Sequence, residues 1–231
     1  SSKYMDTESK VLSQPSNPGL TWEQQALFTV GLSGRFFDRL DVNVEFYNRT
    51  TTDMLMDVPY NYTTGFSSLK ANVGSLSNKG VDITLGVDIL RGRDYWLRAS
   101  TTFNYNAEKV TGLFNGLDRW EMTGYGLAYV VGKPVMFYAP IYAGIDPADG
   151  APMWYLPGEN VDETTMKETT KVFDEASLTQ NTGMRYTPPI YGGFSIGGGW
   201  RGISVQADFS YVLGMTLINN DASFYANPNV F

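Results

Sequence analysis

The chain has 231 residues, no cysteine, no histidine and a formal net charge of −7, with 18% charged and 14% aromatic residues. Without cysteine and histidine it can form no disulfide, no zinc site of the Cys/His type and no Ser–His or Cys–His catalytic pair. The acidic balance argues against a nucleic-acid partner. The sequence has no run of about 20 apolar residues, which excludes a membrane-spanning helix.

The first regular signal is an alternation of apolar and polar residues on both sides of a short turn. Residues 1–21 precede it as an irregular lead-in, which Pro15, Pro18 and Gly19 interrupt. The apolar residues that share one parity are Ala26, Phe28, Val30, Leu32, Phe36, Leu40, Val42, Val44 and Phe46. This period of two predicts strands over about 25–35 and 40–53, joined by a turn at "FFDR".

A second hairpin follows a loop that we predict over 57–76. Within "SNKGVDITLGVDILRGRDYWLRASTTFNYNAEKV", residues 77–110, the large apolar residues at odd positions are Val81, Ile83, Leu85, Val87 and Ile89. Polar residues and glycine stand between them, and alternation resumes after "RGRD". We therefore predict strands over about 80–90 and 95–107, with one apolar face and one polar, charged face.

The middle of the chain is less regular. A loop is predicted over 111–124, strands over about 128–144 and 152–156, and a turn at "DPADGAP" between them, although Gly132, Pro134 and Pro140 interrupt the first of these strands. Residues 157–186 are polar and predict a solvated loop with a possible helix at its centre. Alternation returns in a last hairpin, with strands predicted over about 190–200 and 202–215.

These elements predict an all-β fold of about eight antiparallel strands. Short connections at "FFDR", "RGRD", "DPADGAP" and "WRG" alternate with long ones at 57–76, 111–124 and 157–186. Outer-membrane β-barrels have this asymmetry, with lipid on the apolar side of each strand and the lumen on the other. A soluble β-sandwich would show the same alternation of side chains and remains an alternative at this point.

No catalytic, metal or cofactor site is predicted. Asp41 and Glu45 share a strand face but lie about 13 Å apart by the rise per residue, which exceeds the spacing of a glycosidase pair. "DPADG" lacks the full calcium-loop pattern and predicts a turn. The glycines of "YGGFSIGGGW" are not followed by the Lys and Ser/Thr of a phosphate loop, and they favour a strand with close backbone neighbours.

Aromatic residues in the predicted loops are the best candidates for contacts with a ligand. Flat rings suit sugar faces or peptide side chains, and tyrosine and tryptophan add a polar group. The substrate-binding candidates are Tyr60, Tyr62, Trp120, Tyr125 and Trp154, with Phe66 and Tyr155 as further members of the set.

Several short stretches resemble one family. "NPGLTWE" (17–23) and "SNKGVDITL" (77–85) resemble the Asn-Pro-x-Leu-x-Trp-Glu and Asn-Lys-Gly-Val-Glu signatures of the SusC/RagA class of TonB-dependent outer-membrane transporters. "VGKP" (131–134), "AGIDPADGAPMW" (143–154) and "TPPIYGGF" (187–194) resemble later landmarks of its barrel, in the same order. The resemblance covers most of residues 17–220, and it is the order of five motifs that makes it specific.

The resemblance implies that the chain is a segment of one large β-barrel domain, with the plug and the closing strands outside it. It also implies import of oligosaccharides or peptides across the bacterial outer membrane, a SusD-like surface lipoprotein as lid, and contact with TonB through a part of the transporter outside these residues. No enzymatic activity is expected. Two other functions stay open from the sequence: a complete small outer-membrane barrel acting as a pore or adhesin, and a soluble extracellular β-sandwich that binds glycans.

Overall fold

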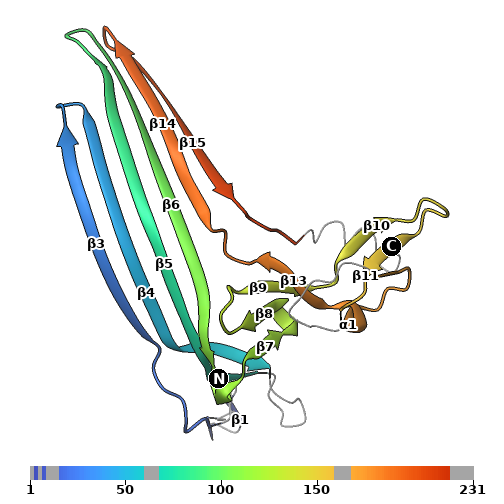
Figure 1. Ribbon diagram of the computed structural model, residues 1–231. Coiled ribbons are helices and arrows are strands. Elements are labelled where there is room, and N and C mark those ends of the chain that lie inside the picture. The colour runs from blue at the N-terminus through green and yellow to red at the C-terminus, as the bar shows by residue number, and fades with distance from the viewer. Residues whose placement is uncertain (1–2, 5–6, 9–15, 60–67, 159–167, 219–231) are drawn as a thin grey trace.

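The computed structural model describes residues 3–4, 7–8, 16–59, 68–158 and 168–218. These residues form mainly antiparallel β-structure, arranged in four sheets (Figure 1). None of the helices in these ranges is long and apolar enough to cross a membrane.

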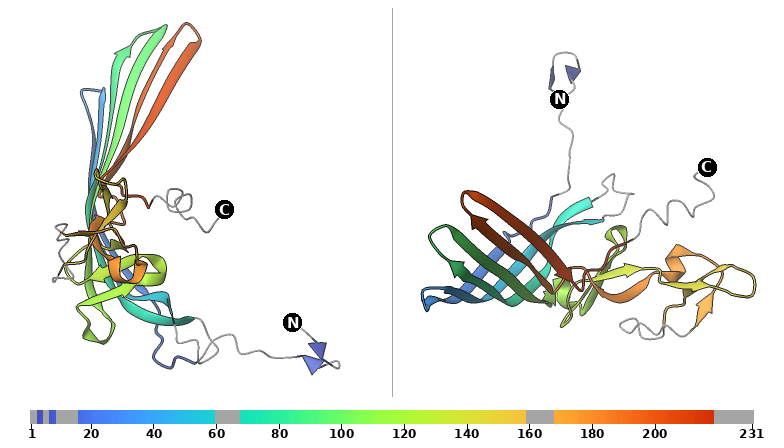
Figure 2. Two further views of the ribbon diagram at one scale, coloured as in Figure 1. Left: turned by 90° about the vertical axis from the view of Figure 1, so that its right-hand side faces the viewer. Right: turned by 90° about the horizontal axis from the view of Figure 1, so that it is seen from above.

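The largest sheet has six strands in the order β15-β14-β6-β5-β4-β3. Their bounds are β3 (Gln24–Phe36), β4 (Leu40–Pro59), β5 (Ser68–Arg91), β6 (Tyr95–Leu113), β14 (Ile190–Trp200) and β15 (Ile203–Leu213). All neighbours are antiparallel. The sheet is curved but not closed, and among the described residues β3 and β15 have one partner strand each (Figure 2). An unclosed sheet does not fit the alternative of a complete small barrel.

Three tight turns join the hairpins at one end of this sheet (Figure 1). Phe37 and Asp38 have φ angles of 52° and 53°, and Arg201 and Gly202 have φ angles of 47° and 86°. Two consecutive residues with positive φ match the twist of the strands that they connect. The turns predicted at "FFDR", "RGRD" and "WRG" are therefore where the sequence indicated.

The two faces of the large sheet differ in chemistry because the strand register keeps the parity of the sequence. Val44 lies opposite Leu32 and Ile83, and Glu45 lies opposite Asp82. The apolar face is open to its surroundings: Phe28 is 67% exposed and Phe209 is 60% exposed. A β-sandwich would cover such a face with a second sheet, and in the part of the chain that is described nothing covers it, which contradicts that alternative.

The strands β4, β5 and β6 are longer than the sequence indicated. β4 extends to Pro59 and β5 begins at Ser68, within the loop predicted over 57–76, and β6 extends to Leu113. The pairing register of β4 and β5 shifts between Thr51 and Met54, where Asp53 has a φ of 54°. Such a bulge breaks the period of two while the strands remain paired, so the sequence pattern ended before the strands did.

Residues 114–189 form an insertion, because β6 pairs directly with β14. The strands expected over 128–144 and 152–156 are therefore not part of the large sheet, which has six strands instead of about eight. In their place lie β8 (Leu127–Val130), β9 (Met136–Ala139), β10 (Tyr142–Ile145) and β11 (Pro152–Tyr155). Strands of four residues extend only about 13 Å, too short for an apolar band of about 25 Å.

The insertion contains two small sheets, and the chain begins with a two-stranded one. A four-stranded sheet has the order β13-β9-β8-β7, and a three-stranded sheet has the order β10-β11-β12. The remaining bounds are β1 (Lys3–Tyr4), β2 (Thr7–Glu8), η2 (Phe114–Gly116), β7 (Arg119–Met122), η3 (Thr123–Tyr125), β12 (Thr169–Thr170), α1 (Glu175–Leu178) and β13 (Gln180–Arg185). In the described part of the polar stretch expected to be a loop over 157–186, the structure thus has two strands and one short helix.

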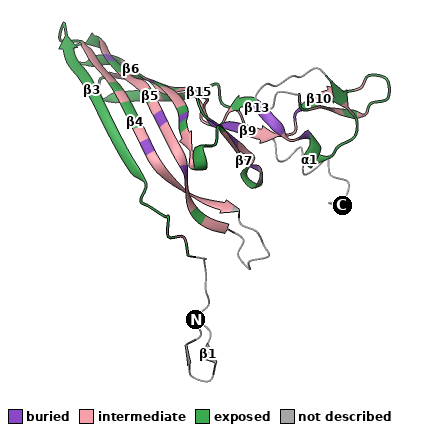
Figure 3. Cartoon of the chain, turned by 60° about the horizontal axis from the view of Figure 1, so that its bottom comes forward, coloured by how far each residue is buried: buried purple, intermediate pink, exposed green. Residues whose placement is uncertain are grey.

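The main apolar core lies where the insertion meets the ends of the long strands. It is built by the buried residues Val110, Met122, Tyr129 and Val135, with Met54, Met56, Leu76, Leu113, Trp120 and Leu127 packed against them. Figure 3 shows that buried residues are scattered along the large sheet and more frequent in the insertion. The core fixes the four-stranded sheet to the end of the large sheet opposite the tight turns.

Candidate functional site: the polar face of the large sheet

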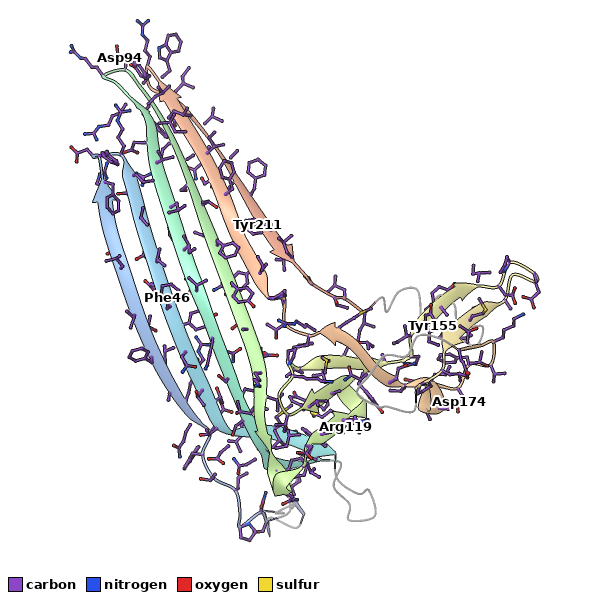
Figure 4. The ribbon with its side chains drawn as sticks, in the orientation of Figure 1. Phe46, Asp94, Arg119, Tyr155, Asp174 and Tyr211 are labelled. Carbon is purple, nitrogen blue, oxygen red and sulfur yellow. The ribbon has the colours of Figure 1, made fainter. Side chains whose placement is uncertain are left out.

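Side chains project from both faces of the large sheet, as Figure 4 shows. On the polar face, the charged side chains nearest the tight turns form a ring of ion pairs. These side chains come from β3, β4, β5 and β6. Arg35 contacts Asp41 at 3.4 Å and Asp88 at 2.9 Å, and Arg98 contacts the same two carboxylates at 2.9 and 3.5 Å. Because three of the four side chains are more than a third exposed, each pair contributes at most about 1 kcal/mol.

Farther from the turns, the polar face carries a ladder of amides and carboxylates. Tyr47 donates to Asn106 Oδ1 at 3.2 Å, Asn106 donates to Asn78 Oδ1 at 3.2 Å, and Asn104 donates to Asp82. These residues line a cavity of about 470 Å³. The ladder fixes side chains from three strands in a polar surface suited to hydrogen bonding.

Glu108 connects this face to the insertion. Its carboxylate accepts from the backbone N–H of Val135 at 3.1 Å and from the hydroxyl of Thr187 at 3.2 Å. Val135 lies just before β9 and Thr187 lies near the end of the insertion, before β14, so one side chain of β6 holds two separate segments of the insertion. Burial raises the pKa of the nearby Tyr129, and the Glu108 carboxylate raises it further.

The "NPGLTWE" stretch attaches the start of β3 to its neighbours through side chains. Asn72 accepts from the N–H of Thr21 and donates to the carbonyl of Thr21, both at 2.9 Å, which imitates a strand pair. Asn17 donates to the carbonyl of Lys70 at 2.9 Å, and the N–H of Leu55 donates to Glu23 at 3.2 Å. The motif is therefore a structural joint at the end where β4 and β5 extend beyond β3.

The "DPADG" turn is held by an ion cluster at the tip of the three-stranded sheet. The Lys171 ammonium lies 2.5 Å from Asp146 and 2.8 Å from Asp149. These hydrogen bonds lower the pKa of both carboxyls and raise the pKa of Lys171. Gly150 has a φ of 74° and donates to the carbonyl of Asp146, so the stretch forms a turn, as the sequence predicted. Within the described residues, no group of three or more His, Cys, Asp or Glu side chains could hold a metal ion.

The aromatic candidates from the sequence do not form one cluster in the described chain. Tyr60, Tyr62 and Phe66 lie outside the described residues. Trp120 is in the four-stranded sheet, 5.5 Å from the ring of Tyr129 in a stacked contact. Tyr125 in η3 is 59% exposed.

Trp154 belongs to the other small sheet. Its ring lies 4.9 Å from Phe173 and 6.4 Å from Tyr142. In Figure 4 the neighbouring Tyr155 and Asp174 lie farther from the large sheet than Arg119 does. Trp120 and Trp154 are therefore held by different parts of the insertion. The sequence predicted a charged strand face that includes Asp41 and Glu45, but it did not predict the partners of these residues, because the partners depend on a strand register that a single sequence does not specify.

Comparison with known proteins gives consistent matches. Over 113 residues, 48% of its length, the chain is 35% identical to TonB-dependent receptor P39 of Formosa agariphila, of which it covers 11%. Over 44% of its length it is 28% identical to TonB-dependent receptor SusC of Bacteroides thetaiotaomicron, of which it covers 10%. In the solved structure of the RagAB peptide transporter, one chain matches 97% of this chain with a TM-score of 0.81 and 42% identity. No protein-family model matches.

The matches define how much of a relative this chain represents. It spans about a tenth of the length of the two curated receptors and 25% of the matched transporter chain. Its open, two-faced antiparallel sheet is consistent with part of a larger barrel. The resemblance found in the short motifs is thus confirmed: the chain is similar in sequence and fold to a β-barrel segment of SusC/RagA-class TonB-dependent transporters.

Proposed function

We propose that the chain forms part of the barrel wall of a TonB-dependent importer in the bacterial outer membrane. The match to the RagAB peptide transporter, 42% identical over 97% of the chain, carries this proposal. The exposed apolar face of the large sheet then contacts lipid, and the polar face lines the lumen. Residues 1–231 belong to one β-barrel domain, whose plug and closing strands lie outside this chain.

The importer takes up oligosaccharides or peptides too large for a porin. Peptides are the first class to test, because the RagAB structure is that of a peptide transporter and shares more of its sequence with this chain than SusC does. Among the aromatic candidates, the exposed Tyr125 is the one best placed to contact substrate, whereas Trp120 supports the four-stranded sheet. Trp154, Tyr60 and Tyr62 remain candidates of the same kind.

Two partners complete the proposal. A SusD-like surface lipoprotein closes over the end that carries the insertion, and TonB acts through parts of the transporter outside these residues. The chain's role is to form the wall and to bind, with no catalytic step.

The direct test is uptake by cells that carry the complete transporter. We expect a labelled peptide above the porin size limit to accumulate in these cells and not in cells lacking the transporter. A protonophore should abolish this uptake, because TonB-dependent transport uses the proton gradient. A labelled oligosaccharide of similar mass is measured in parallel with the peptide, so that uptake of the two proposed substrate classes can be compared. Uptake that persists without the gradient, or without the transporter, would contradict the proposal.

A further inference from the structure

Two acidic side chains face each other across the middle of the polar face. Glu45 in β4 lies directly opposite Asp82 in β5, and both are partly buried. Like charges at directly opposed positions destabilise a sheet. The ion pairs of the described residues involve other carboxylates. The opposed pair therefore lacks a neutralising cation within the described chain.

The ion-pair ring on the same face gives a contrast. There Arg35 lies opposite Asp41, and Asp88 lies opposite Arg98, so each carboxylate has a guanidinium across the strand. Near the tight turns, each carboxylate thus lies opposite a guanidinium. Around Glu45, on the same sheet, the opposed carboxylates have no such cation across the strand.

The unbalanced pair lines the 470 Å³ cavity together with Glu108, and among the residues that the structure describes Arg49 is the single cation in its lining. Asn104 also lines it and is only 8% exposed. The Asn104 Nδ2 group donates to Asp82, but its Oδ1 atom is buried and has no hydrogen-bond partner among the described residues. A buried carbonyl without a partner costs free energy. The cavity therefore presents surplus acceptors and negative charge.

We propose that this cavity, the Glu45–Asp82 pocket, binds a protonated amine or a guanidinium group carried by a polypeptide inside the sheet. Such a group supplies charge and several N–H donors at once. A metal ion fits less well, because the described residues provide no cluster of three His, Cys, Asp or Glu ligands. The cation comes either from a lysine or arginine elsewhere in the same transporter or from a transported peptide, and the second source rests on the proposed function.

The test uses the complete transporter, purified with its partner in detergent. The variant combines Glu45→Gln and Asp82→Asn, which keep the side-chain shapes. The control is Asp208→Asn, on the polar face in β15 but outside the pocket lining. Two fluorescent peptides differ only in lysine versus norleucine. If the peptide supplies the cation, the Kd for the lysine peptide rises about tenfold or more in the double variant, while the norleucine peptide and the control are unchanged.

A second measurement identifies an internal cation. The temperature at which the folded band disappears on gels is recorded without peptide, at low and at high salt. If the transporter supplies the cation, the double variant unfolds at a lower temperature, with a weaker salt dependence, and binds both peptides normally. If the pocket holds no cation, removing the like charges leaves stability unchanged or raises it, and peptide binding does not change; that combination overturns the proposal. A wild-type transporter that binds neither peptide and imports none speaks against the proposed function alone, because the stability comparison still decides whether the pocket holds a cation.

Discussion

The assignment of lipid and lumen faces makes a sharp prediction at the centre of β5. The large apolar residues Val81, Ile83, Leu85 and Val87 occupy one face of this strand. A bulge at Ile89 changes the parity, so Leu90, opposite Leu97, continues this face in its place. Because the bulge adds a residue without adding a step, eight steps of about 3.4 Å give roughly 27 Å along the strand, or about 21 Å of membrane depth at a tilt of about 40°. Leu85 is the middle of this run, so Leu85→Arg places a charge near the midplane.

Arginine on the lipid face at this depth should destabilise the barrel by about 2–4 kcal/mol. The matched variant is Thr84→Arg, one residue away, whose side chain lies on the polar face beside Asn43 and Thr102. There the guanidinium remains in a polar environment, and we expect a cost below about 1 kcal/mol.

The assay is reversible unfolding of the complete transporter in lipid vesicles, followed by heat-modifiable gel mobility. Leu85→Arg should unfold at clearly lower denaturant than Thr84→Arg, which should resemble wild type. Equal destabilisation by the two substitutions would refute the face assignment, and a larger effect of Thr84→Arg would reverse it.

Three further predictions concern particular contacts. A Cβ atom at Gly192 would clash with the backbone oxygen of Thr102 in β6, so Gly192→Ala should lower the free energy of unfolding by about 1–3 kcal/mol. Gly112→Ala, in open space, should not. Replacing Glu108 with alanine removes the carboxylate that accepts a hydrogen bond from the Val135 N–H. Proteolysis at the base of the insertion should become faster, and an unchanged cleavage rate would contradict this role of Glu108. Because hydrogen bonds to Lys171 lower the pKa of Asp146, the turn that they hold is stabilised above the ordinary carboxyl pKa of about 3.9 and loses this contribution as pH falls through the lowered pKa. Hydrogen exchange of residues 146–151, corrected for intrinsic rates, should show lost protection at pH 2.5 relative to pH 5, and pH-independent protection would contradict this.

The sequence predicted the core of the fold where a simple period existed. Around Val44 and Val81 the alternation is uninterrupted, and the structure has strands there with the predicted faces. It failed beyond Thr51, where a bulge changes the parity within one strand. The sequence also failed to separate the strands of the insertion from those of the large sheet, because a short apolar run gives the same sequence pattern in either kind of strand.

The candidate site was less accessible to the sequence. Glu45 and Asp82 are 37 positions apart, and each is an ordinary polar residue of an alternating strand. Only the register brings them face to face. In the same way, nothing local in Glu108 indicates that it would hold Val135 and Thr187.

By itself the sequence determined the composition of each strand face, the positions of the tight turns and the absence of thiol and imidazole chemistry, because these depend on residue type and short spacing. The tertiary structure decided which strands are neighbours, where the insertion packs, and which charges are neutralised. Those properties arise from contacts between residues distant in the chain, and their energies depend on register and burial, which local patterns do not encode.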